Sequence, residues 1–322
     1  MEKLNLIEKR KISVEELVKY YSKLRKIDYD NGSKLKGINL RKRIHFICAF
    51  ILKIDQLLSK EKIVIVKDLH NTFSKRPRIY ACTHSGGQDV ERSLQIIKEP
   101  SYLMLGDPGI LYKMPAYQGL KLNGVIPLES TDKIDRKIAY SRAIELLNKG
   151  GNLLIFPEGA WNVTPNLPVM KIFNGTIRMA KETNAEIVPV GVEQYGNTFY
   201  FNIGKNYTIP VYSTESIEEL RDDLREKLCT LKWEIMETQP ELKRKGVQDN
   251  HLEVFQKEII DRCNPEYGFT LEDAIAESYH DKNITTEEEV FSFLPNLKIN
   301  TSNAFLIKDK LEFTKRLTLT KK

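Results

Sequence analysis

The sequence predicts an α/β fold: a mixed, largely parallel sheet flanked by helices, with helical extensions at the N-terminal and C-terminal ends. Between residues 62 and 203, short β-branched apolar runs alternate with segments of helical period. Outside this region, apolar residues recur only at helical spacing. Hydrophobic residues make up 41% of the 322 residues and charged residues 29%. That composition supports a sizeable core and excludes wholesale disorder.

Residues 1–60 are predicted to form a basic, amphipathic helical segment that docks on a membrane. A first helix is expected over residues 4–27, where apolar side chains recur at helical spacing. Within it, Ser13 and Glu16 have the spacing of a capping box.

A second N-terminal helix is expected over residues 39–58, and its start is basic. Arg41, Lys42 and Arg43 precede a run of apolar residues at helical spacing. This pattern fits an ordinary helix packed on the body of the protein. It also fits a helix lying in the membrane interface, held by apolar burial and by attraction to anionic lipid. The two interpretations are compatible, because one helix can have a packed face and a lipid face.

Residues 61–212 are predicted to be the catalytic domain, and residues 213–322 a helical C-terminal extension. Strands are expected at 63–66, 78–83, 101–105, 125–128, 152–156, 186–192 and 199–203, with helices at 89–97, 132–148 and 176–183. The extension begins with a long helix whose apolar positions lie between 217 and 235. Shorter helical patches follow near 252–260, 271–278 and 286–294.

The charge of the chain is unevenly distributed. The formal net charge is +6, and residues 1–60 alone hold 15 Lys or Arg and 7 Asp or Glu. All of the excess positive charge therefore lies in the first fifth of the chain. A basic end beside a near-neutral body indicates an anionic partner, either a membrane surface or a nucleic acid.

The cysteines and apolar runs place the protein in the cytoplasm, peripheral on the inner face of the membrane. The four cysteines, Cys48, Cys82, Cys229 and Cys263, include no Cys-x-x-Cys pair, so neither a disulfide framework nor a structural zinc site is expected. The longest apolar run, residues 44–52, is far shorter than the ~20 residues of a membrane span. The N-terminus has no apolar core of a signal peptide.

The first candidate catalytic pair follows the predicted strand 78–83. His84 and Asp89 are separated by Ser85-Gly86-Gly87-Gln88, and the two glycines allow a turn that brings the imidazole and the carboxylate together. A neutral imidazole can remove a proton from a hydroxyl near pH 7, and a carboxylate on its other nitrogen fixes the tautomer. Asp89 is equally explained as the cap of the next helix.

A second candidate group follows the predicted strand 152–156. Pro157, Glu158 and Gly159 place a carboxylate at a strand end, where sites gather in open α/β sheets. A tight turn with a solvated Glu158 is the plainer explanation.

Four sequence blocks in this order resemble the glycerolipid acyltransferase family, whose members include acyltransferases of lysophosphatidic acid. The blocks are the His-x4-Asp block at 84–89, the Gly-led block at 124–128, Phe-Pro-Glu-Gly at 156–159 and Val-Pro-Val at 188–190. The segment 173–180 is also similar to the family's region between the last two blocks. The resemblance covers residues 62–212.

The resemblance implies an O-acyltransferase that moves a fatty acyl group from acyl-CoA or acyl carrier protein to a hydroxyl of a lysophospholipid or related lipid. His84 would be the general base and Asp89 would orient it. Pro157, Glu158 and Gly159 would help to bind the acceptor. No metal and no cofactor beyond the acyl donor would be needed, and the partners would be the membrane surface, the donor and the lysolipid.

The sequence departs from the family at two positions where an Arg is usual. Ser130 stands at the end of the second block, and Trp161 stands in the continuation of the third. Because guanidinium groups suit phosphate, their absence leaves a phosphate-free acceptor, such as a glycolipid, as an alternative. Lys133 and Arg136, on the following helix, are candidates to replace them in the substrate-binding site.

Other functions are weaker alternatives. Cys82 and His84 lie two residues apart, as in a cysteine-nucleophile hydrolase, but Cys is more commonly a core residue. Residues 41–43 could contact nucleic acid, yet the sequence contains no recognisable nucleic-acid-binding motif, so no nucleic-acid partner is expected. A non-catalytic lipid-binding protein of the same fold is the remaining alternative.

Overall fold

The computed structural model of the chain describes residues 6–210, 212–241, 244–263 and 268–278. The strands are β1 (Lys62–Asp68), β2 (Arg78–Cys82), β3 (Ser101–Gly106), β4 (Val125–Leu128), β5 (Asn152–Ile155), β6 (Glu186–Tyr195) and β7 (Thr198–Ile203). The helices are α1 (Leu6–Lys11), α2 (Val14–Asp30), α3 (Ile38–Leu58), α4 (Asp89–Ile96), α5 (Pro115–Asn123), α6 (Lys133–Asn148), α7 (Gly175–Thr183), α8 (Ile217–Met236), α9 (His251–Asp261) and α10 (Leu271–Glu277). Two short 3₁₀ helices lie at Gly109–Lys113 and Arg244–Gly246.

The seven described strands form one sheet in the order β1-β7-β6-β2-β5-β3-β4. All neighbouring pairs are parallel except the hairpin of β6 and β7. The predicted mixed, largely parallel sheet is therefore confirmed. Strand β2 lies in the middle of the sheet, between β6 and β5, so its carboxyl end opens at the centre of one edge.

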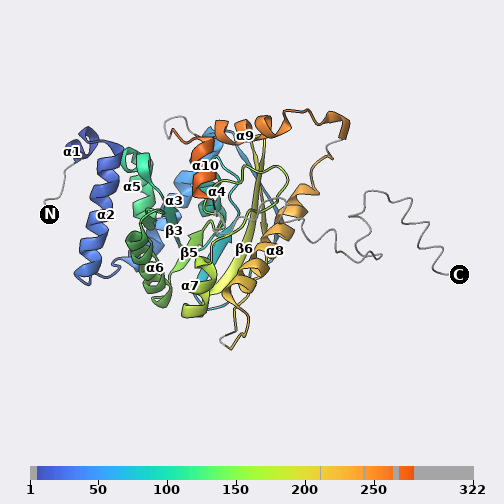
Figure 1. Ribbon diagram of the computed structural model, residues 1–322. Coiled ribbons are helices and arrows are strands. Elements are labelled where there is room, and N and C mark those ends of the chain that lie inside the picture. The colour runs from blue at the N-terminus through green and yellow to red at the C-terminus, as the bar shows by residue number, and fades with distance from the viewer. Residues whose placement is uncertain (1–5, 211, 242–243, 264–267, 279–322) are drawn as a thin grey trace, which may run out of the picture. The chain divides into compact units, whose positions relative to one another are not determined.

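Helices cover both faces of the sheet (Figure 1). On one face, α6, α7 and α8 pack on alternate strand residues such as Ile79, Leu153 and Ile187. On the other face, α4 packs on the intervening residues, among them Tyr80 and Leu154, with Leu52 of α3 and Leu120 of α5 at its margin. This alternation follows from the period of two along each strand. A strand buried on both faces reads as a continuous apolar run, which is what β2 and β5 show.

The N-terminal helix predicted over residues 4–27 is interrupted in the structure. Ser13 caps α2: its Oγ accepts from Glu16 N at 3.1 Å, while its own N–H donates to Glu16 Oε2 at 2.8 Å. The capping box was therefore predicted correctly, but it begins a new helix and so divides the segment into α1 and α2. Helix α2 lies beside α6 (Figure 1), and Arg25 of α2 forms a salt bridge with Asp135 of α6.

The described residues from 6 to 278 form one compact unit. Packing does not stop at residue 212, because α8 lies on the sheet and Leu220, Leu224 and Leu228 are part of the core. The predicted boundaries at 60 and 212 therefore separate segments of different expected function, and the core continues across the boundary at 212. Two helical segments, 109–113 and 115–123, had no sequence prediction; Pro115 at the first position of α5 is suited to a helix start. The helical patch predicted at 286–294 lies outside the described residues.

Candidate active site

His84 lies directly beyond the carboxyl end of β2. The strand is buried along its whole length, and Thr83 continues it by exchanging two hydrogen bonds with the backbone of Val192 through its hydroxyl, at 3.0 and 2.8 Å. The chain then turns sharply through Gly86 and Gly87, whose φ angles are +91° and +63°. Residues with a side chain rarely adopt these angles, so the two glycines make the turn accessible.

The turn brings His84 and Asp89 together. His84 Nδ1 and Asp89 Oδ2 are 2.8 Å apart, and the carboxylate is completely buried. The same Oδ2 accepts from the backbone N–H of Ser85 at 2.6 Å and of Gly86 at 3.0 Å. Asp89 therefore both closes the turn and accepts a hydrogen bond from the Nδ1–H group of the imidazole. With the proton on Nδ1, the Nε2 lone pair of His84 is available to act as a base.

Glu158 lies beneath His84, and the structure gives it a positioning role. The side chain is completely buried; Oε1 accepts from the backbone N–H of His84 at 2.9 Å and Oε2 from that of Met170 at 2.8 Å. The prediction that Glu158 binds the acceptor is corrected here, because both of its oxygens are occupied by backbone donors. The carboxylate instead ties the loop after β2 to the segment around Met170.

A buried lysine, Lys232 of α8, supports this arrangement from below. Its Nζ lies 2.8 Å from Glu193 Oε2, and the lysine side chain is only 4% exposed. Burial by itself disfavours the ammonium ion, but Glu193 and Glu158 outweigh it and raise the pKa of Lys232. Burial raises the pKa of Glu158, against the opposing effect of Lys232 and of the two backbone donors. Lys232 lies four residues after Leu228 and three before Ile235, so the helical period already places it on the apolar face of α8.

The loop after β5 forms one wall of the site. Phe156 lies against the imidazole of His84, with ring centroids 4.4 Å apart, and Trp161 lies edge-on to it at 6.1 Å. The N–H of Asn162 donates to the carbonyl of His84 at 2.9 Å. Pro157 accepts from Phe173 N at 2.8 Å, which fixes the loop to the chain before α7.

Gly159 is confined in this wall. Its φ is +79°, and a Cβ there would lie 2.4 Å from the ring of Phe173. Glycine is therefore required by conformation and by space. The structure places Gly159 in the wall of the site, and its contact with the acceptor stays a prediction.

The other predicted substrate-binding residues lie farther away. Ser130, Lys133 and Arg136 follow β4, which β5 and β3 separate from β2; three strand spacings amount to about 14 Å. Ser130 donates from its N–H to Asp107 Oδ1 at 2.8 Å, and Arg136 donates to the carbonyl of Ser130. Lys133 and Arg136 are exposed. All three lie at the same edge of the sheet as His84, but the structure does not bring them into contact with it.

Cys82 is unsuited to act as a nucleophile. It is completely buried in the apolar cluster around β2 and β6, and burial raises the pKa of its thiol. We therefore expect Cys82→Ser to keep most of its acyl-transfer activity, with a modest loss of stability from placing a hydroxyl in an apolar site. Mass spectrometry of the protein quenched during turnover is the check, and an acyl group on Cys82 would contradict the histidine-base scheme.

No group of three or more His, Cys, Asp or Glu side chains in the described part of the chain is arranged to hold a metal ion. The groups that the described site offers for chemistry include the imidazole of His84, its carboxylate partner Asp89 and the aromatic wall. Such a site suits proton removal from a hydroxyl that attacks a carbonyl carbon.

Residues 63–193 match the family model described as Acyltransferase. A chloroplastic 1-acyl-sn-glycerol-3-phosphate acyltransferase of Arabidopsis thaliana is 27% identical over 117 residues, which are 36% of this chain and 32% of that protein. A chloroplastic 1-acyl-sn-glycerol-3-phosphate acyltransferase of Brassica napus is 25% identical over 165 residues, 48% of this chain and 46% of that protein. The chain thus spans less than half the length of either curated relative.

A solved structure shares the fold. The crystal structure of the 1-acyl-sn-glycerophosphate acyltransferase of Thermotoga maritima matches with a TM-score of 0.50 and 17% identity, covering 70% of this chain and 91% of that one. The matched family region contains His84, Asp89 and Glu158 together with β1 to β5 and most of β6. Residues 63–193 are thus similar to an acyltransferase domain, as found in the 1-acyl-sn-glycerol-3-phosphate acyltransferases of the glycerolipid acyltransferase family.

Proposed function

We propose that the protein transfers a fatty acyl group from a thioester donor, acyl-CoA or acyl carrier protein, to a hydroxyl of a lysolipid, with His84 as the general base. The observation that carries the proposal is the hydrogen bond between His84 Nδ1 and Asp89 Oδ2. The backbone N–H groups of Ser85 and Gly86 donate to the same oxygen and hold it in the turn. This geometry leaves Nε2 as the one ring nitrogen available to the acceptor.

The reaction follows from the chemistry of these groups. Nε2 of His84 removes the proton of the acceptor hydroxyl as its oxygen attacks the thioester carbonyl carbon. Buried Asp89 stabilises the imidazolium that forms. When the tetrahedral intermediate collapses, the carbon–sulfur bond breaks and the imidazolium returns the proton to the leaving thiolate. The products are an ester and a free thiol, so protons and electrons balance without a further cofactor.

The acceptor has two candidate chemistries. The names of the curated relatives support a lysophospholipid of the 1-acyl-glycerol-3-phosphate type. The absence of arginine at Ser130 and Trp161 supports a phosphate-free lysolipid such as a glycolipid. A non-catalytic lipid-binding protein of the same fold is the alternative outside enzymology.

The test is a direct assay of acyl transfer. Purified full-length protein is incubated with radiolabelled acyl-CoA or acyl carrier protein and a panel of lysolipids, and the labelled product is identified by mass spectrometry. We expect a labelled diacyl product whose formation requires His84. Lysolipid binding without product from any donor and acceptor pair would favour the lipid-binding alternative.

The outward face of α3 supports a membrane surface as partner. Its exposed apolar side chains, each at least 44% exposed, are Leu40, Phe46, Ile47, Phe50, Ile51, Ile54, Leu57 and Leu58. The inward face carries a polar residue instead: His45 is 2% exposed, and its Nδ1 lies 2.8 Å from Asn123 Oδ1. A helix whose apolar stripe faces outward fits a surface that is itself apolar.

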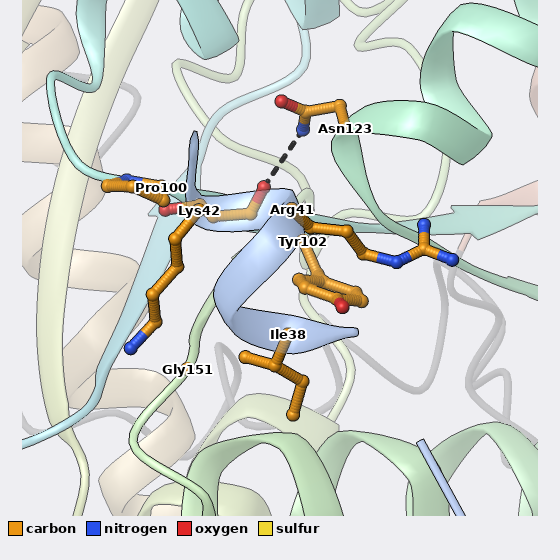
Figure 2. A pocket seen from close by; sticks show the side chains of 8 residues that line it. Ile38, Arg41, Lys42, Pro100, Tyr102, Asn123 and Gly151 are labelled. Carbon is orange, nitrogen blue, oxygen red and sulfur yellow. Dashed lines mark hydrogen bonds between the residues drawn. The ribbon is translucent and has the colours of Figure 1, made fainter. Parts of the chain in front are cut away.

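The basic start of α3 faces the body of the protein more than the outside. Figure 2 shows Arg41 beside Tyr102, with Lys42 on the side of Pro100. The guanidinium of Arg41 lies 5.6 Å from the centroid of the Tyr102 ring, and Lys42 Nζ donates to the carbonyl of Gly150 at 3.0 Å. These two cations therefore fasten the helix to the domain, whereas Arg43 is exposed. Attraction to lipid then depends on the apolar face more than on the basic triplet.

None of the described helices is long and apolar enough to cross a membrane. We propose that the protein binds peripherally, on the cytoplasmic face, with α3 in the interface. The N-terminal helices α1 to α3 and the excess of positive charge in residues 1–60 support this proposal.

We expect the double variant Ile47→Ser/Phe50→Ser to lose at least tenfold in binding to liposomes. Each of these side chains contributes about 1–2 kcal/mol when buried in lipid, and 1.4 kcal/mol is a factor of ten. Co-sedimentation with anionic vesicles measures the loss. Trp233→Ser, at an exposed apolar residue of α8, is the matched control and should bind like the wild type. Equal binding by the double variant would mean that α3 does not enter the bilayer.

A further inference from the structure

The C-terminal helices α9 and α10 cover the two loops that form the candidate active site. Ile259 of α9 is 3% exposed, and its Cγ2 lies 3.0 Å from the position that a Cβ would occupy at Gly86. The Cβ of Arg262, just after α9, lies 3.3 Å from the corresponding position at Gly87. The turn between His84 and Asp89 is therefore packed directly against this C-terminal segment, above the carboxyl edge of the sheet (Figure 1).

The same segment is fastened to the loop after β5 by aromatic contacts. The rings of Trp161 and Phe269 lie 4.5 Å apart at an angle of 56°. They belong to a cluster built on three buried residues, Val163, Ile259 and Ala274. Trp161 thus stands at a position where a phosphate-binding Arg is usual in the family, and it holds α9 and α10 in place.

Glu277, the last residue of α10, lies at the site itself. Its carbonyl oxygen is 3.2 Å from the position that a Cβ would occupy at Gly159, and its carboxylate interacts electrostatically with His84. Burial, then the neighbouring carboxylates Asp107 and Asp273, raise the pKa of Glu277 to about 7, while His84 acts in the opposite direction. Within the described part of the chain, the Glu277 carboxylate makes no hydrogen bond or ion pair.

Two arginines around the end of β4, Arg25 and Arg136, already have partners. Arg25 holds Asp135 through its Nε at 2.8 Å and through Nη2, which also lies 3.1 Å from Glu129. Arg136 donates to the carbonyl of Ser130. A phosphate taken out of water beside Glu277 would need a cation to offset its charge, and these two would have to break existing contacts to supply one.

We propose that Glu277 determines acceptor specificity: the acceptor head group carries no phosphate and donates hydrogen bonds, from hydroxyl or ammonium groups, to the Glu277 carboxylate beside the Trp161–Phe269 wall. The inference rests on the proposed acyl transfer at His84 and specifies its substrate class. A hydroxyl or ammonium donor satisfies a carboxylate to which no described residue donates a hydrogen bond, whereas a phosphate is repelled by it.

The test compares lysolipids with the same acyl chain and different head groups. Full-length protein receives labelled acyl donor with lysophosphatidic acid, with a lysolipid bearing a neutral sugar, or with one bearing an ammonium group. We expect kcat/KM for the best phosphate-free acceptor to exceed that for lysophosphatidic acid at least tenfold. A larger effect of Glu277→Gln on the ammonium lipid than on the sugar lipid identifies a cationic head group, and equal effects identify a neutral one.

Two variants of α10 isolate the role of the carboxylate. We expect Glu277→Gln to raise KM for the preferred acceptor at least tenfold, with a smaller change in kcat and no change in the KM of the donor. The same variant should lower the ratio of kcat/KM for the preferred acceptor to kcat/KM for lysophosphatidic acid. Glu272→Gln removes an exposed carboxylate from the same helix and should change neither value. Preference of the wild type for lysophosphatidic acid, or an unchanged preference in Glu277→Gln, would overturn the inference.

A binding measurement separates this inference from the proposed function. In a Trp233→Phe background, Trp161 is the remaining tryptophan and its fluorescence reports lysolipid binding next to His84. Tighter binding of the phosphate-free lysolipids than of lysophosphatidic acid, weakened by Glu277→Gln, supports the head-group preference even if no acceptor is turned over. If the lysolipids bind with this preference but no acceptor is turned over, the proposed acyl transfer is wrong and the head-group preference stands. If lysophosphatidic acid binds more tightly than the phosphate-free lysolipids, the proposed role of Glu277 is wrong.

Discussion

His84→Ala is expected to lower acyl-transfer turnover by about 10²–10⁴-fold, because it removes the group that takes the acceptor proton. This factor corresponds to about 2.7–5.5 kcal/mol of activation free energy. The fold should be kept, since the backbone N–H of residue 84 still donates to Glu158 and the ring is at the edge of the core. Steady-state kinetics with labelled donor and a thermal melt of the same preparation measure the two effects.

A second histidine provides the control for this variant. His70 is hydrogen-bonded to Asp68 at the end of β1, outside the motifs, so His70→Ala removes another His–Asp pair and should leave turnover close to the wild-type value. More than a tenth of wild-type turnover in His84→Ala would mean that another group removes the proton. Asp89→Asn should also lose most of its activity, because an amide no longer stabilises the imidazolium.

Lys232→Met is expected to destabilise the protein by about 3–5 kcal/mol, which is the usual effect of removing one partner from a buried ion pair. The substitution leaves Glu193 and Glu158 without the ammonium that lies beneath the site. Denaturant unfolding measures the loss. Lys227→Met, on the same helix, removes an exposed pair with Asp223 and should cost no more than about 1 kcal/mol. Equal stability of the two variants would show that Lys232 is not needed to offset the buried carboxylates.

The loss in Lys232→Met should depend on pH. The pKa of Glu158 is already raised above its ordinary value of 4.5, and without Lys232 it should rise further. A buried carboxyl group whose pKa is raised in the folded state is tolerated best when it is protonated. Its contribution to the free energy of unfolding is therefore most favourable below its unfolded-state pKa and is lost as the pH rises through the folded-state pKa. The difference between Lys232→Met and the wild type should therefore shrink as the pH falls toward 4.5.

The parts of the site that were predictable from sequence are those built within one short segment. His84 and Asp89 lie five residues apart, and the two intervening glycines made a turn between them readable from the sequence alone. The roles of Glu158 and Lys232 were not readable, because both depend on how distant segments pack. A carboxylate at a strand end can point outward to a ligand or inward to backbone donors, and residue spacing is the same in both cases. Spacing places Lys232 on the inward face of α8, but which carboxylates it meets there follows only from the fold.

The sheet was predictable because its strands are short, apolar and separated by helices of clear period. The orientation of α3 was not predictable, since its amphipathic pattern fits an apolar face packed on the body of the protein or one turned outward. The structure places His45 inside, and it meets Asn123 at the end of α5, a helix that the sequence had not predicted. Similarly, the patches at 252–260 and 271–278 were recognised as helical, but their position over the site follows only from contacts such as that of Trp161 with Phe269.

The pairing of β1 with β7 has a consequence for synthesis of the chain. β1 contacts no other strand of the described sheet, and its partner β7 lies about 130 residues later in the sequence. At a translation rate of roughly 5–20 residues per second, β1 waits about 7–26 s for the strand that completes its hydrogen bonds. During that interval, the nascent chain presents an unpaired strand directly after the apolar face of α3. Early contact of α3 with a bilayer, or with a chaperone, would therefore protect the growing polypeptide from aggregation before its sheet can close.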